Sequence, residues 1–213
     1  ANYVNDIMQD HNGTMWFATE NGLCKLNSDG KSFTRTLHQS TRPTSLISNR
    51  TSKLLQDDGG VIWIGTQSGI SRWNASLNYF PHINKHGKYK KLSSNSIMAF
   101  ATDSQENLYL GTWNGGVSII SNQSNKVTNL RASPQADSAL QEDNVMSLLV
   151  DDNDDLWIGT LRSGLHYKKK NASEFTIYTH DKNDSNSISD NAISKILNLS
   201  NGTLAIGTYG GGL

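Results

Sequence analysis

The chain has 213 residues, with 19 basic and 19 acidic side chains that leave no net charge at neutral pH. This balance shows neither the cationic stripe typical of nucleic-acid binding nor an acidic solvating tail. No apolar run is long enough for a membrane span within these residues, and the single cysteine, Cys24, excludes an internal disulfide and a cysteine-based zinc cluster.

The first part of the chain predicts a meander of short strands. Near-alternating residues at 4–8 predict a first strand, and the turn formers His11-Asn12-Gly13 follow it. A second strand is predicted at Trp16-Phe17-Ala18-Thr19, a tight turn and a third strand at Gly22-Leu23, and a fourth strand at Ser32-Phe33-Thr34. Short apolar segments joined by Gly, Asn and Asp turns are typical of antiparallel sheets and not of helices.

The same unit recurs along the chain. An apolar run that ends in a small residue and Thr occurs at Trp16-Phe17-Ala18-Thr19, Trp63-Ile64-Gly65-Thr66, Tyr109-Leu110-Gly111-Thr112, Trp157-Ile158-Gly159-Thr160 and Ala205-Ile206-Gly207-Thr208. The threonines lie 47, 46, 48 and 48 residues apart. Nine residues before Thr stands an Asp in four copies (Asp10, Asp57, Asp103 and Asp151) and Leu199 in the fifth. Later fourth strands are predicted at Tyr79-Phe80, Lys126-Val127-Thr128 and Phe175-Thr176-Ile177-Tyr178.

Four antiparallel strands in about 40–50 residues form one blade of a β-propeller. The sequence therefore predicts an all-β fold, a β-propeller of four-stranded antiparallel blades with about 4.5 blades present. The predicted blades cover residues 1–37, 47–83, 95–131 and 144–180, with a half-blade at 191–213. Because the last unit stops after its second turn, we expect a fragment of a larger, seven-bladed ring. Its exposed edges would be covered by the remaining blades of the same protein or in a homodimer.

The run Trp-Ile-Gly-Thr also predicts how blades pack. The aromatic and the small residue point to one face of the sheet, and the aliphatic residue and Thr to the other. A bulky ring beside a missing side chain would let neighbouring sheets approach closely.

The unit resembles the two-component regulator propeller repeat. The residues that carry the resemblance are Asn, apolar positions, Asp-x-x-Gly, Trp-Ile-Gly-Thr and a final Gly-(Leu/Ile), best kept from Asn49 to Ile70 and from Asn144 to Leu165. The stretch from Tyr178 to Asn191 is similar to that family's inter-blade linker. The third copy departs from the pattern with Glu106 and Tyr109, and the fifth with Ala205. The sialidase-type Asp box also combines Asp, Gly and Trp, but the spacing of Asp10, Gly13 and Trp16 does not match it.

The resemblance implies a function. Proteins with these repeats are mostly hybrid sensor histidine kinases of Bacteroidetes, whose propellers lie outside the cytoplasmic membrane and respond to glycans. It therefore implies a periplasmic, ligand-sensing segment of a membrane receptor that recognises an oligosaccharide and contains no cofactor. The alternatives are a propeller enzyme that acts on glycans (a lyase or glycosidase) and a scaffold for protein docking.

The expected ligand-binding residues follow from meander parity. The turns after the second strand share one end of the blades with the linkers to the next blade, and propellers generally use that end for recognition. The ligand-binding residues expected there are Glu20, Gln67, Trp113, Asn114, Arg162 and Tyr209, and the linkers add His38, Arg42, His82, His86 and Lys88. Aromatic faces stack on sugar rings, and Arg and Asn donate hydrogen bonds to hydroxyls and carboxylates. The alternative is that these large residues fill the central funnel or a blade interface.

Neither a metal site nor a catalytic constellation is predicted. The acidic run Asp151–Asp155 lacks the Gly and Glu of a calcium loop and is interpreted as a solvated first turn. His82 and His86 lie in a loop bounded by Pro81 and Gly87, so their spacing does not indicate a metal site. No Gly-x-Ser-x-Gly occurs, and the acidic pairs lie in repeated turns. We therefore expect the segment not to be an enzyme.

Overall fold

The structure is a computed structural model that describes residues 3–74, 80–84, 86, 91–133, 135–136, 138–199 and 202–213. These residues form strands, turns and loops but no helix, and so none long and apolar enough to cross a membrane. The chain divides into two compact units, Ala1–Met98 (unit 1) and Ala99–Leu213 (unit 2), and the division falls within strand β9.

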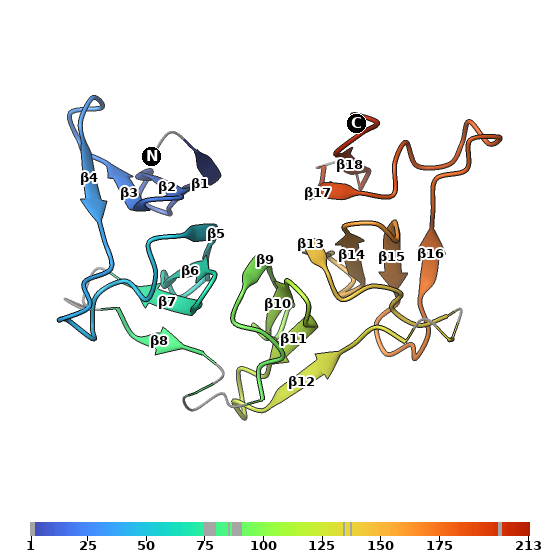
Figure 1. Ribbon diagram of the computed structural model, residues 1–213, viewed down its shortest axis with the longest axis horizontal. Helices are drawn as coiled ribbons and strands as arrows, with labels where there is room; N and C mark the ends of the chain where they lie inside the picture. The colour runs from blue at the N-terminus through green and yellow to red at the C-terminus, as the bar shows by residue number, and fades with distance from the viewer. Residues whose placement is uncertain are drawn as a thin grey trace. The chain divides into compact units, whose positions relative to one another are not determined.

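Unit 1 contains two four-stranded sheets, each a simple meander (Figure 1). Blade 1 has the order β1-β2-β3-β4, with β1 Val4–Gln9, β2 Met15–Thr19, β3 Gly22–Leu26 and β4 Phe33–Thr36. Blade 2 has the order β5-β6-β7-β8, with β5 Thr51–Gln56, β6 Ile62–Thr66, β7 Gly69–Trp73 and β8 His82–Ile83. All pairs are antiparallel.

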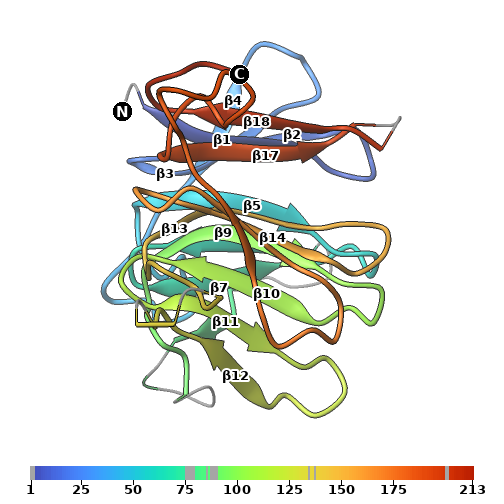
Figure 2. The same ribbon diagram turned by 90° about the vertical axis from the view of Figure 1, so that its right-hand side faces the viewer.

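Unit 2 continues the same plan, and Figure 2 shows β10, β11 and β12 stacked in order within one sheet. Blade 3 consists of β9 Ile97–Thr102, β10 Leu108–Thr112, β11 Gly116–Ile120 and β12 Val127–Leu130. Blade 4 consists of β13 Val145–Val150, β14 Leu156–Thr160, β15 Leu165–Lys168 and β16 Thr176–Tyr178. Half-blade 5 consists of β17 Ile193–Asn198 and β18 Leu204–Thr208. The predicted all-β fold of four-stranded antiparallel blades is confirmed.

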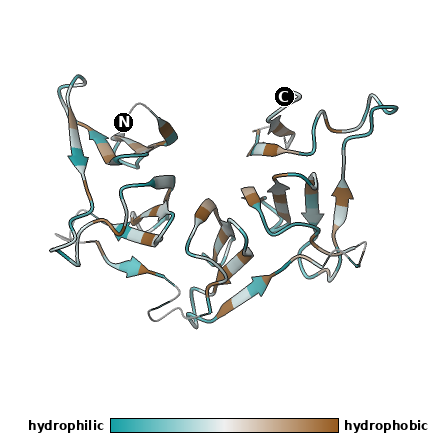
Figure 3. Ribbon diagram, viewed as in Figure 1, coloured by the Kyte–Doolittle hydropathy of each residue, from teal (hydrophilic) through white to brown (hydrophobic). Residues whose placement is uncertain are grey.

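The hydrophobic core lies between successive blades. One cluster in unit 1 joins Trp16 and Ala18 of blade 1 to Leu54, Ile62 and Ile64 of blade 2. In unit 2 the corresponding clusters join blade 3 to blade 4 and blade 4 to half-blade 5. Figure 3 shows hydrophobic residues on the strands and mostly hydrophilic residues in the loops. Within each unit, neighbouring sheets therefore pack face to face through their apolar side chains, as in a propeller.

The fourth strand of blade 2 differs from the prediction. The expected segment was Tyr79-Phe80, but β8 starts at His82; Tyr79 lies outside the described residues. The backbone N–H of Phe80 donates to the carbonyl of Thr44 in the preceding linker (2.8 Å), and Pro81 has no N–H to donate. Pairing with β7 therefore begins at His82 and Ile83.

A hydrogen bond explains why Asp and Trp recur together. The indole Nε1 of Trp16 donates to Asp10 Oδ2 (2.8 Å), Trp63 to Asp57 (2.7 Å) and Trp157 to Asp151 (2.9 Å). The other oxygen of each Asp accepts backbone N–H groups of its own turn, as Asp10 Oδ1 does from Asn12 and Thr14. The pair ties the first hairpin turn to the second strand and satisfies a buried indole.

The two irregular copies follow the same rule. In the third copy Tyr109 replaces Trp, and its hydroxyl donates to Asp103 Oδ2 (3.2 Å). Burial, then the charge of Asp103, raises the pKa of Tyr109 to about 12, so the phenol remains a donor. In the fifth copy both members are absent, because Leu199 replaces Asp and Ala205 replaces Trp.

The small residue of the repeat allows neighbouring sheets to approach, as the sequence predicted. A Cβ on Gly159 of β14 would lie 2.5 Å from Cγ2 and 2.8 Å from Cβ of Ile193, which lies in β17 of the neighbouring sheet. A Cβ on Gly111 would lie 2.7 Å from Cγ1 of Val145 in β13. Glycine is needed here for space, since neither residue has a positive φ.

We expect Gly159→Ala to lower the free energy of unfolding of unit 2 by about 2 kcal/mol, because the added methyl overpacks the contact with Ile193. Gly59→Ala is the matched control: its Cβ would approach only a side-chain oxygen of Asp57, at 3.4 Å, and the change should be neutral or slightly stabilising. Urea unfolding followed by circular dichroism measures both. Equal stability of the two variants would contradict the packing role of Gly159.

Candidate ligand-binding face

The threonine of each repeat builds the turn that follows it. Its hydroxyl donates to the carbonyl of the turn glycine, as Thr19 Oγ1 does to Gly22 and Thr66 Oγ1 to Gly69 (both 2.7 Å). The last three copies have one more residue in this turn, yet the bond persists at 3.0, 2.9 and 3.0 Å in Thr112, Thr160 and Thr208. The residues just after Thr are therefore displayed on a rigid turn.

The linkers reach these same turns. Gly22 N donates to the carbonyl of Asn49 (2.7 Å), Gly116 N to that of Asp143 (2.9 Å) and Gly164 N to that of Asn191 (3.0 Å). Within each unit, the linker and the second turn thus lie at the same end of the blade, as meander parity predicts. The bonds also correct the register of the fourth copy, where Asp143, and not Asn144, is the counterpart of Asn49.

Two linkers have the same internal bonds. The backbone N of His38 donates to Asn49 Oδ1 and its ring Nδ1 to the carbonyl of Leu46 (both 2.7 Å). His180 forms the same bonds to Asn191 Oδ1 (2.7 Å) and to the carbonyl of Ile188 (2.8 Å). The expected linker candidate His38 is therefore engaged in holding its own linker.

The other linker candidates have separate places. His82 Nε2 donates to the carbonyl of Ser45 (2.6 Å) and also stabilises that linker. Arg42 lines a pocket of about 200 Å³ together with Phe80 and neighbouring linker residues. His86 is exposed, and its backbone N donates to Asn84 Oδ1 (2.9 Å). Lys88 lies outside the described residues.

In unit 1 the two expected ligand-binding residues, Glu20 and Gln67, are joined by Arg50, which the sequence analysis did not single out. Arg50 forms an ion pair with Glu20 Oε2 (Nε, 3.3 Å) and donates to Gln67 Oε1 (Nη1, 3.2 Å). Asn5 donates to the other oxygen of Glu20 (3.0 Å). Glu20, Arg50 and Gln67 thus form a polar row that crosses from the second turn of blade 1 to that of blade 2.

In unit 2 the turn of blade 3 exposes an aromatic ring. Trp113 is 39% exposed, although Trp is usually largely buried. Asn114 follows with a φ of 59°, in the left-handed region that Asn tolerates, and its backbone N donates to Asn144 Oδ1 (3.1 Å). These contacts fix the backbone of the turn and leave the two side chains at the surface.

Two acidic linker residues tie the neighbouring turns together. Glu142 accepts from the backbone N of Arg162 (2.7 Å) and from Asn144 Nδ2 (3.0 Å). Asp143 forms an ion pair with Arg131 (2.5 Å). Burial raises the pKa of Asp143, but the hydrogen bonds from Arg131 and from the backbone N of Ala132 outweigh it and lower that pKa. Both carboxylates therefore act as positioning groups.

Tyr209 occupies the same position in half-blade 5. Its side chain is 64% exposed, while its backbone N donates to the carbonyl of Ala192 (2.9 Å). The second turns of unit 2 thus present an indole, a phenol, the Asn114 amide and the exposed Arg162 guanidinium on anchored backbone. Such a set can stack on rings and donate hydrogen bonds to hydroxyls and carboxylates.

The acidic run on the opposite end of blade 4 is only partly solvated. Asp155 is 7% exposed and accepts from the Tyr167 hydroxyl (2.5 Å) and the backbone N of Lys170 (2.6 Å). Asp154 accepts from Lys170 Nζ and Ser104 Oγ (both 2.6 Å). The interpretation as a solvated turn holds for Asp152 and Asn153, which are exposed, and was wrong for Asp154 and Asp155, because their carboxylates accept from donors that are distant in sequence.

Comparison with known protein families matches three stretches of the chain. A family model described as two component regulator propeller matches residues 1–21, 91–114 and 139–162. A comparison with curated proteins finds no matching sequence.

Solved structures similar to the chain include extracellular domains of two hybrid two-component systems from B. thetaiotaomicron. The first has a TM-score of 0.76 and 20% identity, with 98% of this chain and 27% of that one covered. The second has a TM-score of 0.75 and 23% identity, with 100% and 33% covered. A gluconolactonase from Xanthomonas campestris is also similar, with a TM-score of 0.67, 11% identity and coverage of 97% and 69%.

This chain spans about a quarter to a third of the length of the two hybrid-system domains. At these identities the likeness shows the fold, which an enzyme and extracellular domains of two-component systems share. Three stretches of the chain therefore match the two-component regulator propeller model, and the described residues fold as successive β-propeller blades.

Proposed function

We propose that the chain is a ligand-sensing propeller segment of a hybrid two-component sensor histidine kinase, placed on the extracytoplasmic side of the membrane. The regulator-propeller repeats and the similar extracellular domains support this placement. The segment binds and does not catalyse, and transmission across the membrane belongs to other parts of the receptor.

The ligand proposed for the second turns is an oligosaccharide derived from a glycan. The observation that carries this proposal is the exposure of Trp113 and Tyr209, 39% and 64%, on turns whose backbone is held by hydrogen bonds. A rigid, exposed aromatic ring loses little conformational entropy on binding and offers its face to an apolar sugar face. Asn114 and Arg162 supply hydrogen bonds beside the rings.

The test is a glycan-fragment screen on the complete extracytoplasmic region, with affinity measured by calorimetry. For the fragment that binds, Trp113→Ala should weaken binding by about ten-fold, the loss of one stacking contact. Phe33→Ala is the control, since Phe33 is 56% exposed on β4, away from the second turns, and should leave the affinity unchanged.

Three outcomes would contradict the proposal. If Trp113→Ala bound the glycan as tightly as the unmodified protein, the second turns would not form the binding site. Steady consumption of the glycan would indicate a propeller enzyme, and binding of a protein partner with no response to any glycan would indicate a docking scaffold.

A further inference from the structure

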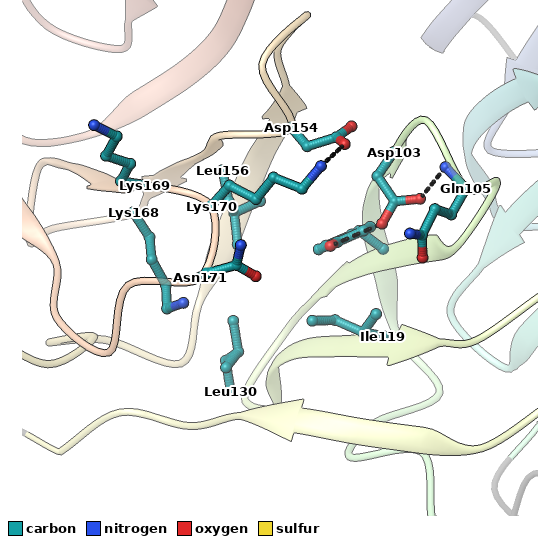
Figure 4. A pocket seen from close by; sticks show the side chains of 11 residues that line it. Asp103, Gln105, Ile119, Leu130, Asp154, Leu156, Lys168, Lys169, Lys170 and Asn171 are labelled. Atoms are coloured by element: carbon teal, nitrogen blue, oxygen red, sulfur yellow. Dashed lines mark hydrogen bonds and ion pairs between the residues drawn. The ribbon is translucent and has the colours of Figure 1, made fainter.

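Blades 3 and 4 enclose a cavity of about 250 Å³ at the end opposite the second turns (Figure 4). Its apolar wall consists of Ile119, Leu130 and Leu156, and it is completed by polar side chains from the first turns of both blades, from β10, and from the end of β15 and the loop after it. The polar lining residues are Asp103, Gln105, Tyr109, Asp154, Lys168, Lys169, Lys170 and Asn171.

The cavity lies at a place where blades 1 and 2 have two aromatic rings and blades 3 and 4 do not. Between blades 1 and 2 the corresponding space is filled by Trp16 and Trp73, whose ring centroids lie 4.9 Å apart. Tyr109 is the counterpart of Trp16, three residues before the repeat Thr. Lys168 is the counterpart of Trp73, four residues after the turn glycine. Replacing two indoles by a phenol and an amine leaves room between the blades.

The two carboxylates of the cavity have little capacity left for a ligand. Asp103 accepts four hydrogen bonds, from the backbone N of Gln105 and Asn107, from Asn107 Nδ2 and from Tyr109. Four is about the acceptor limit of a carboxylate. Asp154 accepts from Lys170 Nζ and from the backbone N and hydroxyl of Ser104. Neither is available as the main partner of a ligand hydroxyl.

The hydrogen-bond donors, in contrast, have capacity to spare. Figure 4 shows Lys168 and Asn171 extending toward Leu130. Lys168 Nζ donates to the carbonyl of Ala172, which leaves two of its three N–H groups. Within the described residues, the side-chain amides of Gln105 and Asn171 form no hydrogen bond. The cavity thus combines an aliphatic wall with an excess of donors and one uncommitted positive charge.

We propose that this cavity binds a small carboxylate of one-ring size, with the carboxylate on Lys168 and the ring against Leu130 and Leu156. A charged acceptor forms stronger hydrogen bonds with an ammonium than a neutral hydroxyl does. The volume lies just below the range of about 300–1,000 Å³ typical of small-molecule pockets, which restricts the ligand to a single ring. The ring belongs to an acidic sugar or to an aromatic acid.

Titrations of the full chain with glucuronate, benzoate and glucose, followed by NMR, test the proposal and separate the two sources. We expect saturable binding of at least one carboxylate, with shifts at Leu130 and Leu156, and much weaker binding of glucose. Binding of neither carboxylate, or binding of glucose as strong as that of glucuronate, would overturn the proposal.

Two matched substitutions test the role of the ammonium. Lys168→Met keeps the aliphatic stem and should weaken carboxylate binding by at least about ten-fold, the loss of one charged hydrogen bond. Lys182→Met removes the same charge from an exposed linker residue that does not line the cavity, and should change the affinity by less than about two-fold. Equal effects would mean that only the overall charge matters.

The double variant Tyr109→Trp/Lys168→Trp recreates the ring pair of blades 1 and 2. It should abolish carboxylate binding without lowering the melting temperature, because indoles fill the space and Asp103 keeps a donor. Retained binding in a folded double variant would place the ligand elsewhere. If the double variant does not fold, the comparison of the two methionine variants still shows whether the Lys168 ammonium binds the carboxylate.

Discussion

Replacing Trp16 by alanine is expected to lower the free energy of unfolding of unit 1 by about 4 kcal/mol, the typical cost of deleting a buried aromatic side chain. Trp16 is 4% exposed, contacts Trp73 of the next blade and donates to Asp10. The substitution removes the packing between two blades and also leaves a buried carboxylate oxygen without its donor. Chemical unfolding followed by far-UV circular dichroism measures the change.

Trp16→Phe separates the two contributions. It keeps most of the ring but not the indole N–H, so it should cost about 1–3 kcal/mol through the unpaired oxygen of Asp10. Phe33→Ala, an exposed aromatic on the edge strand of the same blade, should change stability by less than about 1 kcal/mol. A loss below 1 kcal/mol in Trp16→Ala would show that the Asp–Trp pair does not hold unit 1 together.

Unit 2 should lose about 3 kcal/mol of stability as the pH falls from 6.5 to 4, because His166 must be neutral in the folded chain. His166 lies fully buried in β15, and its Nε2 accepts a hydrogen bond from the backbone N of Gln141 (3.3 Å). Burial lowers the pKa of His166 to about 4, although the charge of Glu142 acts in the opposite direction. In the unfolded chain a histidine titrates near 6.5.

The sign follows from proton binding. Between pH 6.5 and 4 the unfolded chain binds a proton that the folded chain does not, so acid favours unfolding in this range. The contribution is fully present above pH 6.5, and no further change comes from this group below pH 4. His166→Ser, which places in β15 the residue that Ser71 and Ser118 provide in β7 and β11, should remove this part of the pH dependence. An unchanged difference in stability between pH 7 and pH 4.5 would exclude His166 as its source.

The sequence predicted the inner strands well because their signal is local. The run from Trp157 to Thr160 alternates in character. Its turn glycine, Gly164, and its hydrogen-bonded partner, Asp151, lie only a few residues away along the chain. The outer strands are harder to predict because each has only one neighbour and an exposed face. For β8 the starting residue depends on a hydrogen bond from Phe80 to Thr44, which lies in the preceding linker.

The candidate face was predicted only in part, for a related reason. Parity of the meander placed Trp113 and Tyr209 at the same end of the blades as the linkers, and the linker hydrogen bonds to the second turns agree with that. The groups that hold the second turns, Arg50, Glu142 and Asp143, come from linkers and lie 30, 20 and 27 residues from their partners Glu20, Arg162 and Gly116, so these pairs cannot be read from spacing. One signal was present: charged residues stand beside the Asn that ends each of these linkers. The cavity at Lys168 was missed because it depends on two residues in different blades, Tyr109 and Lys168, which stand where blades 1 and 2 have Trp16 and Trp73.

The bond between Asp and Trp limits how copies of this repeat can diverge. Exchanging Trp alone leaves a carboxylate oxygen without its donor, and exchanging Asp alone leaves an indole N–H without its acceptor. Either single exchange therefore passes through a less stable protein. The third copy avoided that penalty by taking a tyrosine, which still donates to Asp103. The fifth copy, with Leu199 and Ala205, has lost both groups. Mutational drift in these arrays should therefore occur as correlated pairs six residues apart, and such pairs should be visible among the repeats of other propellers of this type.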